Sequence, residues 1–402
     1  MVRVTVKSWR ASKAAEVKHV LVQALLPLMM IGCAHHQVVA TKPPERQIAM
    51  DPVLFHAQPS GNVELIDPAA QFERANGQFR DKQFAESAAS FERIAHDYPD
   101  SHFVVPSLYN AGLALEQAGD LSGAIERYRR ITVEHPDDKD ILDAWFRMGR
   151  IQADAKRFAD ATQTWNEILA RKDLAFADRL EAMARRGFAL FEQKELIPAE
   201  RTFREQLAYY KAHEAEERLD SDFFLGMSAY YLGEVAHEQY RALPVRLPER
   251  QMSRDLEAKA RLLLVAQARF VDAMRVNNTE WATAAGFQIG SLYREFYDDL
   301  VGAPIPPSLN GEAREVYLDE VKKHVRTLLQ KAISVHEKNI MMAERVGEKN
   351  DWVRRSNEQM DQLRKLLVPG PVPPVDEAPA PSATPATPIP RPRDEVHAPV
   401  MM

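Results

Sequence analysis

Apolar residues between positions 66 and 212 recur with helical spacing, and the whole pattern repeats along the chain. Three glycines in the middle of predicted helices, Gly112, Gly149 and Gly187, are 37 and 38 residues apart. An alanine follows twelve residues later, and an aromatic residue four residues after that: Ala124, Ala161 and Ala199; Tyr128, Trp165 and Phe203. A fixed period of about 20–50 residues marks stacked structural repeats. The pattern therefore predicts pairs of helices that stack on one another.

The residue types in the pattern have a physical reason. A glycine inside a helix costs about 1 kcal/mol relative to alanine, so a repeated glycine needs a packing role. We expect a neighbouring helix to approach closely there, with the aromatic residue of the second helix filling the gap. An earlier copy has Ala75, Ser87 and Phe91 at the three positions. Pro99 and Pro136 close the first two copies, because proline cannot continue a helix.

The fold class predicted from this pattern is all-α, since no run of alternating β-branched residues with a hairpin turn is apparent. The predicted helix pairs lie at about 66–100, 101–137, 138–174 and 176–212. Degenerate pairs with insertions at 241–253 and 301–310, and a final capping helix, extend the stack over 213–368. Residues 33–65 lack periodicity and are predicted to be a flexible tether. The proline-rich segment 369–402 is predicted to be disordered.

One copy carries a nearly complete set of recognisable positions. These are Leu108, Gly112, Leu115, Gly119, Asp120, Ala124, Tyr128 and Pro136. The set resembles the tetratricopeptide (TPR) repeat, and the resemblance is clear over 66–210 and weaker to about 368. It implies a right-handed helical solenoid whose first helices line a concave groove that holds other proteins. Chains of this kind are scaffolds, so the resemblance implies no catalysis.

The groove positions of the TPR repeat can be transferred to this chain. They place an aromatic residue on the first helix of each pair, beside amides and arginines. The implied partner-binding residues are Phe72, Asn76, Tyr109, Asn110, Phe146, Arg147, Arg150, Phe188 and Phe191. An exposed row of rings there would suit an extended peptide. The alternative is that the rings close the gaps between repeats.

Some TPR proteins clamp the C-terminal carboxylate of a partner with two asparagines, two lysines and an arginine. Asn76, Asn110 and Arg147 fall on three of these five positions. The two lysine positions hold Phe72 and Asp143, and an acidic side chain repels a carboxylate. The complete clamp is therefore not expected.

The first 32 residues form a different kind of segment. A basic start precedes an apolar run at 20–32, which at about 13 residues has the length of a signal-peptide core. The run ends in Met30-Ile31-Gly32-Cys33, and Cys33 is the single cysteine of the chain. This resembles the lipobox of bacterial lipoproteins and implies lipid attachment to Cys33, although leucine is usual where Met30 stands. The alternatives are an ordinary secretory signal with an incidental cysteine, or a cytoplasmic protein with an apolar N-terminus.

Charge and motif content narrow the function. Cleavage before Cys33 would change the net charge from −6 to about −10, and no basic patch stands out, which argues against a nucleic-acid partner. The residue after the cysteine is Ala34 and not aspartate, which resembles the sorting signal of lipoproteins that go to the outer membrane. No catalytic motif, metal-ligand spacing or cofactor signature is present. The sequence predicts a lipid-anchored scaffold for envelope proteins on the periplasmic face of the outer membrane. A motility-type complex is favoured over β-barrel assembly, a pilotin role or a peptidoglycan-associated accessory role.

Overall fold

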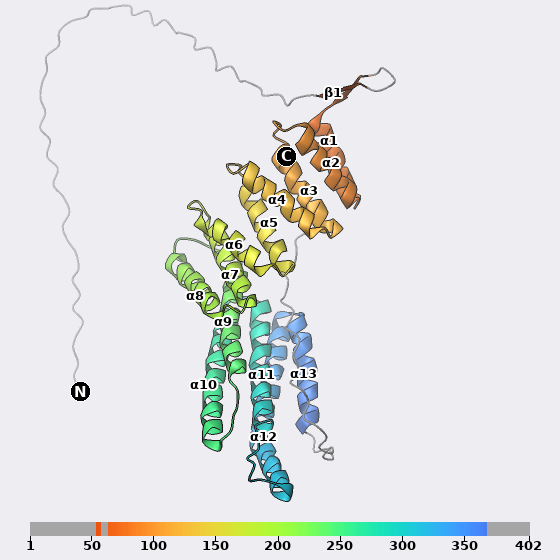
Figure 1. Cartoon of the computed structure of the whole chain (residues 1–402). Helices are drawn as coiled ribbons and strands as arrows, with labels where there is room; N and C mark the ends of the chain where they lie inside the picture. Colours follow the sequence, from red (N-terminus) through yellow and green to blue (C-terminus); the bar gives the residue numbers. More distant parts are fainter. Residues whose placement is uncertain (1–53, 58–62, 368–402) are drawn as a thin grey trace, which may run out of the picture. The chain divides into compact units, whose positions relative to one another are not determined.

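The computed structural model describes residues 54–57 and 63–367 (Figure 1). The predicted signal peptide at 1–32, Cys33, most of the predicted tether and the proline-rich segment at 369–402 lie outside the described residues. Lipid attachment and the properties of these segments therefore stay predictions.

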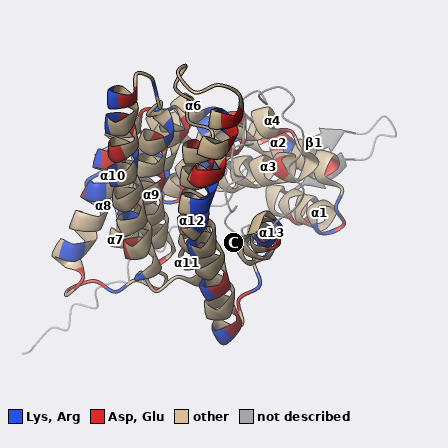
Figure 2. Ribbon diagram, turned by 90° about the horizontal axis from the view of Figure 1, so that it is seen from below, with Lys and Arg blue, Asp and Glu red and all other residues tan. Residues whose placement is uncertain are grey.

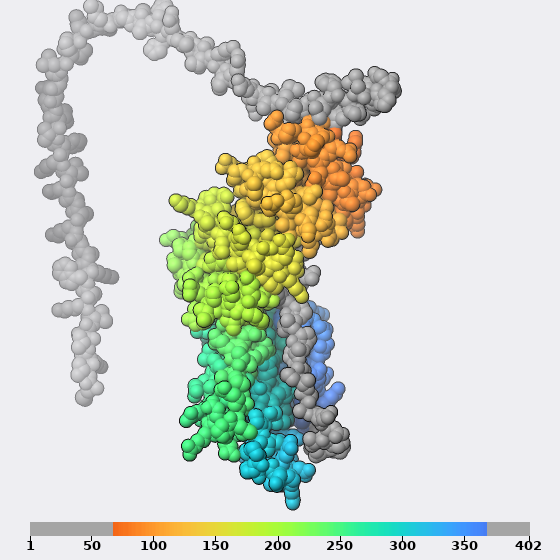
Figure 3. Space-filling view, viewed as in Figure 1, coloured from red at the N-terminus to blue at the C-terminus, as the bar shows by residue number. Residues whose placement is uncertain are grey.

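Thirteen helices occupy the described part of the chain. They are α1 Pro68–Arg80, α2 Phe84–Asp97, α3 Val104–Ala118, α4 Leu121–Glu134, α5 Ile141–Asp154, α6 Phe158–Ala170, α7 Phe176–Glu192, α8 Leu196–His213, α9 Phe223–Ala242, α10 Glu249–Met274, α11 Thr279–Val301, α12 Gly311–Val346 and α13 Asp351–Leu367. Every helix packs on the next, and α7, α9, α11 and α13 also contact one another in that order. The space-filling view follows the same succession from α1 to α13 (Figure 3). The predicted all-α solenoid of the TPR type is confirmed.

Close helix contacts at the repeated glycines are also confirmed. A Cβ atom added to Gly112 would lie 2.6 Å from the Tyr128 ring, and one added to Gly187 would lie 2.4 Å from the Phe203 ring. Gly149 faces Trp165 in the same way, at 2.7 Å. Each glycine thus makes a notch in the first helix, and the ring of the second helix fills it.

The turn inside each of the first four pairs follows one backbone pattern. Gly119 ends α3 in the left-handed conformation, with φ 85°, and Asp120 caps α4 by accepting a hydrogen bond from the Gly123 amide at 2.8 Å. At the corresponding positions of the other three pairs stand lysines with φ between 59° and 63°: Lys82, Lys156 and Lys194. Glycine adopts this conformation without steric cost, whereas a side chain is strained in it.

A short β-hairpin precedes the first helix and corrects the sequence prediction. Strand β1 Leu54–Ala57 pairs antiparallel with β2 Val63–Ile66, with Leu54 opposite Ile66. The sequence indicated neither strand and placed this stretch in the predicted tether. Two four-residue strands are too short for alternation of apolar and polar residues to stand out. The intervening residues 58–62 include Pro59 and Gly61, which are typical of turns and were the available signal.

The helices α9 to α12 are longer than those before them. α10 has 26 residues and α12 has 36, whereas α1 to α6 have 13 to 15 each. The largest apolar core of the described residues joins α7 and α8 to these long helices and includes Phe203, Tyr231 and Trp281. We call 68–213 the N-terminal region and 223–367 the C-terminal region.

Candidate partner-binding site

The rings predicted to form an exposed row are mostly buried. The side chains of Phe72, Tyr109, Phe188 and Phe191 are 2–8% exposed, and Phe146 is half-buried. The prediction of an exposed aromatic stripe in the groove is therefore wrong, and the alternative, in which the rings close the gaps between repeats, describes the structure.

Three of these rings, Phe72, Tyr109 and Phe146, pack against the aromatic ring on the second helix of the same pair, whereas Phe188 and Phe191 pack against Tyr231 on α9. The ring centroids of Phe72 and Phe91 are 5.2 Å apart, and those of Tyr109 and Tyr128 are 5.5 Å apart, both edge to face. Phe146 meets Trp165 in the same arrangement at 5.6 Å. Aromatic pairs favour this geometry and distance. The two aromatic positions of a repeat therefore form one packing unit, which withdraws the first-helix ring from the surface.

The two predicted amides do not form an exposed pair either. Asn76 and Asn110 are fully buried between helices. Asn76 donates a weak hydrogen bond to Glu73 at 3.4 Å within its own helix. Both residues thus serve the packing of the stack. Because their amides are buried, they do not form a clamp for the carboxylate of a partner.

The arginines of the predicted set remain as a site. Arg147 on α5 is 7% exposed and pairs with Glu116 on α3 at 3.4 Å, yet its Nη2 atom is buried without a hydrogen-bond partner. The Tyr109 hydroxyl lies in the field of Arg147 and Arg150. The structure therefore brings three of the predicted residues together, one on α3 and two on α5.

Arg150 is the member of this group that forms no ion pair among the described residues. It is half-buried, and within 63–367 it forms no hydrogen bond either. Burial lowers the pKa of Arg150, and the like charges of Arg147 and Arg185 lower it further, while the carboxylates of Glu181 and Glu116 offset only part of this. Binding of an anion would stabilise the charged guanidinium of Arg150, because the anion would offset both its desolvation and its repulsion by the other arginines.

Arg185 on α7 completes what we call the arginine cluster, Arg147, Arg150 and Arg185. Its guanidinium pairs with Glu181 at 2.6 Å and lies 5.1 Å from the centre of the Phe224 ring on α9. These contacts hold Arg185 between α7 and α9. The sequence prediction missed this residue because transferring TPR groove positions to α7 selected the phenylalanines instead. Its place two residues before Gly187, matching Arg147 before Gly149, was the available signal.

Acidic residues border the cluster at the helix starts. Asp143 lies in the first turn of α5 and Asp178 in the first turn of α7. Burial raises the pKa of Asp178, and the carboxylates of Glu181 and Asp143 raise it further. Figure 2 likewise shows Lys and Arg interspersed with Asp and Glu rather than gathered in one field. The site thus offers local recognition of a single anionic group rather than a broad basic surface.

Comparison with known proteins identifies the repeat. Residues 69–101 and 107–138 match the family model described as "Tetratricopeptide repeat". The chain carries tetratricopeptide repeats. The two matched stretches correspond to the first two helix pairs, α1–α2 and α3–α4, and the same notch and ring recur beyond them in α5–α6 and α7–α8. No protein with a curated description matches the sequence.

Several solved TPR structures resemble the chain at low identity. A tetratricopeptide repeat protein from Parabacteroides merdae is 12% identical, with 74% of this chain and 98% of that chain covered and a TM-score of 0.36. The C-terminal part of a TPR protein from Cytophaga hutchinsonii is 12% identical, with 73% and 95% covered and a TM-score of 0.38. At these scores the matches carry no argument about function.

Neither a metal-ligand cluster nor a membrane-spanning helix is present among the described residues. No group of three or more His, Cys, Asp or Glu side chains among them is arranged to hold a metal ion. None of the helices between 63 and 367 has both the length and the apolar character needed to cross a membrane.

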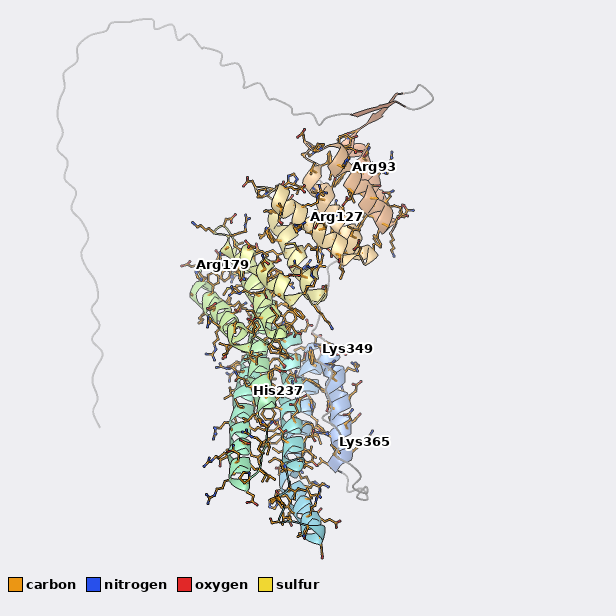
Figure 4. All side chains as sticks on the ribbon, viewed as in Figure 1. Arg93, Arg127, Arg179, His237, Lys349 and Lys365 are labelled. Atoms are coloured by element: carbon orange, nitrogen blue, oxygen red, sulfur yellow. The ribbon has the colours of Figure 1, made fainter. Side chains whose placement is uncertain are left out.

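A polar network in the C-terminal region was also missed by the sequence prediction. His237 on α9, labelled in Figure 4, is fully buried, and its Nε2 atom lies 3.0 Å from Glu295 on α11. Arg241 donates two further hydrogen bonds to Glu295, at 2.7 and 3.0 Å. Burial alone would raise the pKa of Glu295, but His237 and Arg241 outweigh it and lower the pKa to about 2. This network ties α9 to α11, and the Nδ1 atom of His237 is buried in it without a hydrogen-bond partner.

Proposed function

We propose that this protein is a lipid-anchored TPR scaffold on the periplasmic face of the outer membrane, and that it binds an anionic group of a partner protein at the arginine cluster. The observation that supports binding most directly is Arg150, which is half-buried near two like charges and forms no ion pair of its own within 63–367. A carboxylate matches the planar fork of a guanidinium and forms charge-assisted hydrogen bonds with it. The buried Nη2 of Arg147 supplies a second donor without a partner.

The anchoring part of the proposal depends on the sequence. The motif that ends in Cys33 supports lipidation, and Ala34 supports retention at the outer membrane rather than the inner one. A stack of helix pairs that carries no catalytic motif suits a holding function in an envelope complex, of the motility type or of an assembly machine. The partners are other envelope proteins, and the membrane contact is the lipid.

The arginine site can be tested with a defined peptide. A fluorescein-labelled peptide with a single glutamate, flanked by alanine and glutamine, is titrated by anisotropy at low salt. Arg150→Gln should weaken its binding at least tenfold, because the variant loses the cation but keeps a polar side chain that can donate a hydrogen bond. Arg129→Gln, at an exposed arginine on α4, is the matched control and should stay within twofold.

The outcome that rejects the site is equal binding by Arg150→Gln and the unchanged protein. Arg150→Gln should fold normally, since removing one of three like charges relieves repulsion. Its melting temperature should be unchanged or slightly raised, so a loss of binding would not reflect misfolding.

The anchor is tested separately by Cys33→Ser. The variant should move from the outer-membrane fraction to the soluble periplasm, because stable attachment depends on the acyl chains. A variant that still sediments with membranes after a high-salt wash would show that the lipid is not the anchor.

A further inference from the structure

A pocket lies at the start of α12, beside the insertion at 301–310. Its volume is about 500 Å³, and most of the side chains that line it are apolar, among them Ile305, Pro306, Leu309 and Leu318. Pro306 is buried, whereas the other three are half-buried. Sites that bind another molecule are typically concave and mostly apolar, and apolar grooves are the usual docking surfaces of proline-rich segments. The pocket therefore suits a short segment of proline and aliphatic residues.

Helix α13 runs antiparallel to α12 and points towards this pocket. Asn339 on α12 donates a hydrogen bond to Ser356 in the first half of α13 at 3.0 Å. Arg326, thirteen residues earlier on α12, donates to the carbonyl of Leu367 at the end of α13 at 2.7 Å. The end of α13 is thus held level with Arg326. The first part of α12, residues 311–325, extends beyond it, as Figure 1 shows.

The face of α12 that packs on α13 continues to the pocket. Leu329 on α12 and Leu363 on α13 belong to one buried apolar cluster. Val325 and Leu318 are four and eleven residues before Leu329, or about one and three helical turns, so they lie on the same face as Leu329. Both are half-buried, whereas Leu329 is 2% exposed. An apolar track therefore leads from the end of α13 to the pocket.

The residues that follow α13 have the composition and the length to occupy this track. They read Val-Pro-Gly-Pro-Val-Pro-Pro-Val over 368–375. Leu318, at the pocket, is eight residues or about 12 Å along α12 from Arg326. A polyproline II chain rises about 3.1 Å per residue, so Val372 would lie about 15 Å and Val375 about 25 Å beyond the end of α13. With three residues per turn, both valines lie on one edge of that chain.

We propose that residues 368–375 of this chain dock as an extended strap along α12 and place Val372 and Val375 in the pocket. Tethering makes the docking intramolecular, with an effective concentration in the millimolar range, so two buried valines suffice to hold the strap. The prolines restrict the chain before it docks, which lowers the entropy lost. The strap shares no residue with the arginine cluster and is independent of the proposed function. A proline-rich segment of a partner would have to displace it.

Hydrogen–deuterium exchange of the full-length protein tests the strap. Val372→Ser together with Val375→Ser should speed the exchange of amides within 303–318 at least about threefold, because the loop and the first turns of α12 lose their cover. Val396→Ser together with Val400→Ser, in the same proline-rich segment, is the matched control and should change nothing. Both pairs of substitutions lie outside the thirteen helices, so the stack itself remains intact.

A labelled peptide assigns the effect to the pocket. A fluorescein-labelled peptide of residues 368–375 should bind the Val372→Ser, Val375→Ser protein at least tenfold more tightly than the unchanged protein, in which the strap competes with it. Adding Leu318→Ser to that double variant should abolish binding of the peptide. Adding Val316→Ser instead, at an exposed position of the same helix that does not line the pocket, should leave binding unchanged.

Three results would overturn the strap. The first is equal exchange within 303–318 in the unchanged protein and the Val372→Ser, Val375→Ser variant. The second is protection that rises with protein concentration, which would place a segment of a second copy in the pocket. The third is equal binding of the peptide by both proteins, which would mean that the pocket is open to a partner. None of these results alters the test of the arginine cluster.

Discussion

The N-terminal and C-terminal regions use the same notch but fill it with different chemistry. In the N-terminal region an aromatic ring fills each notch, as Phe203 does at Gly187. The C-terminal region repeats this twice, with Phe270 at Gly233 and Trp281 at Gly226. The next notch, Gly290, receives the imidazole of His336 instead, and Gly286 receives the amide of Asn339.

Replacing an aromatic ring by a polar side chain changes the free energy of burying the group that fills the notch. His336 is fully buried, and neither of its ring nitrogens has a hydrogen-bond partner. Asn339 has more hydrogen-bond partners than His336, since its Nδ2 donates to the Thr283 carbonyl at 2.9 Å and to Ser356 at 3.0 Å. A ring of carbon atoms loses nothing on burial, whereas an unpartnered polar atom loses its hydration. The same shape thus stabilises the fold more at Phe203 than at His336, whereas Trp165, which fills the notch at Gly149, also buries its Nε1 atom without a partner.

Longer helices and buried polar links compensate in the C-terminal region. Lys259 on α10 is almost fully buried, pairs with Asp299 at 2.9 Å and lies 4.1 Å from the centre of the Tyr240 ring. Tyr240 also donates to Asp299. Together with the network around Glu295, these contacts join α9, α10 and α11. The same repeat geometry can therefore be held by apolar packing or by specific polar pairs. Only the stability that the polar pairs contribute depends on pH.

The largest expected effect is the loss of a notch-filling ring. Phe203→Ala should lower the free energy of unfolding by about 3–5 kcal/mol, because Phe203 is fully buried and leaves a cavity. His336→Ala should cost only about 1–2 kcal/mol, since it also removes two unpartnered nitrogens. Urea melts of both variants measure the difference, and equal losses would contradict the comparison.

The pH dependence of His336 sharpens the comparison. Burial lowers its pKa to about 4 from an ordinary value of 6.5, so the folded state keeps the ring neutral. As the pH falls from 6.5 towards 4, the unfolded chain binds a proton that the folded chain does not. Stability is therefore complete above pH 6.5 and is lost through this window, by about 3 kcal/mol in total.

His336→Phe restores the ring that the other notches contain and is the matched test. The variant should lose this part of the pH dependence while other titrating groups continue to contribute, so the difference between the two melt series isolates His336. If the two series run parallel between pH 6.5 and 4, the imidazole is not held neutral by burial.

The notch itself is tested by adding one methyl group. Gly149→Ala should destabilise the protein by about 1–3 kcal/mol, because the new Cβ would lie 2.7 Å from the Trp165 ring. Gly77→Ala in α1 is the control: only an arginine side-chain atom lies near that position, at 4.0 Å. It should stabilise the helix by up to about 1 kcal/mol. A raised melting temperature for Gly149→Ala would show that the helices are not in close contact there.

The smallest expected effect concerns the turn inside a helix pair, where the second pair has Gly119 and the other three have a left-handed lysine. Lys156→Gly should stabilise the N-terminal region by up to about 1 kcal/mol, since it relieves a left-handed lysine with φ 59°. Part of this gain is offset by the greater freedom of glycine in the unfolded chain. A lower melting temperature than that of the unchanged protein would mean that the lysine side chain has a stabilising contact of its own.

Most of the stack could be predicted from the sequence, because its determinants are local and periodic. Gly112 and Tyr128 are sixteen residues apart, and the same separation links Gly149 to Trp165. The direction of the first-helix rings could not be predicted, since an apolar ring such as Phe72 suits either a groove or a gap between helices. Neighbouring helices decide between the two. The lysine turns could have been found, because Lys82 and Lys156 are each 37 residues from Gly119.

The sequence by itself determined the repeat, its glycine notches and most of the rings that fill them, because each pair of residues lies within one short helical hairpin. Only the tertiary structure decided which charges meet, since Arg150 and Arg185 come from α5 and α7, and His237 and Glu295 from α9 and α11. It also decided the partner of Gly290. The insertion at 301–310 and the long helix α12 move the residue that meets it to His336, 46 positions away instead of sixteen, beyond the reach of a pattern with a fixed period.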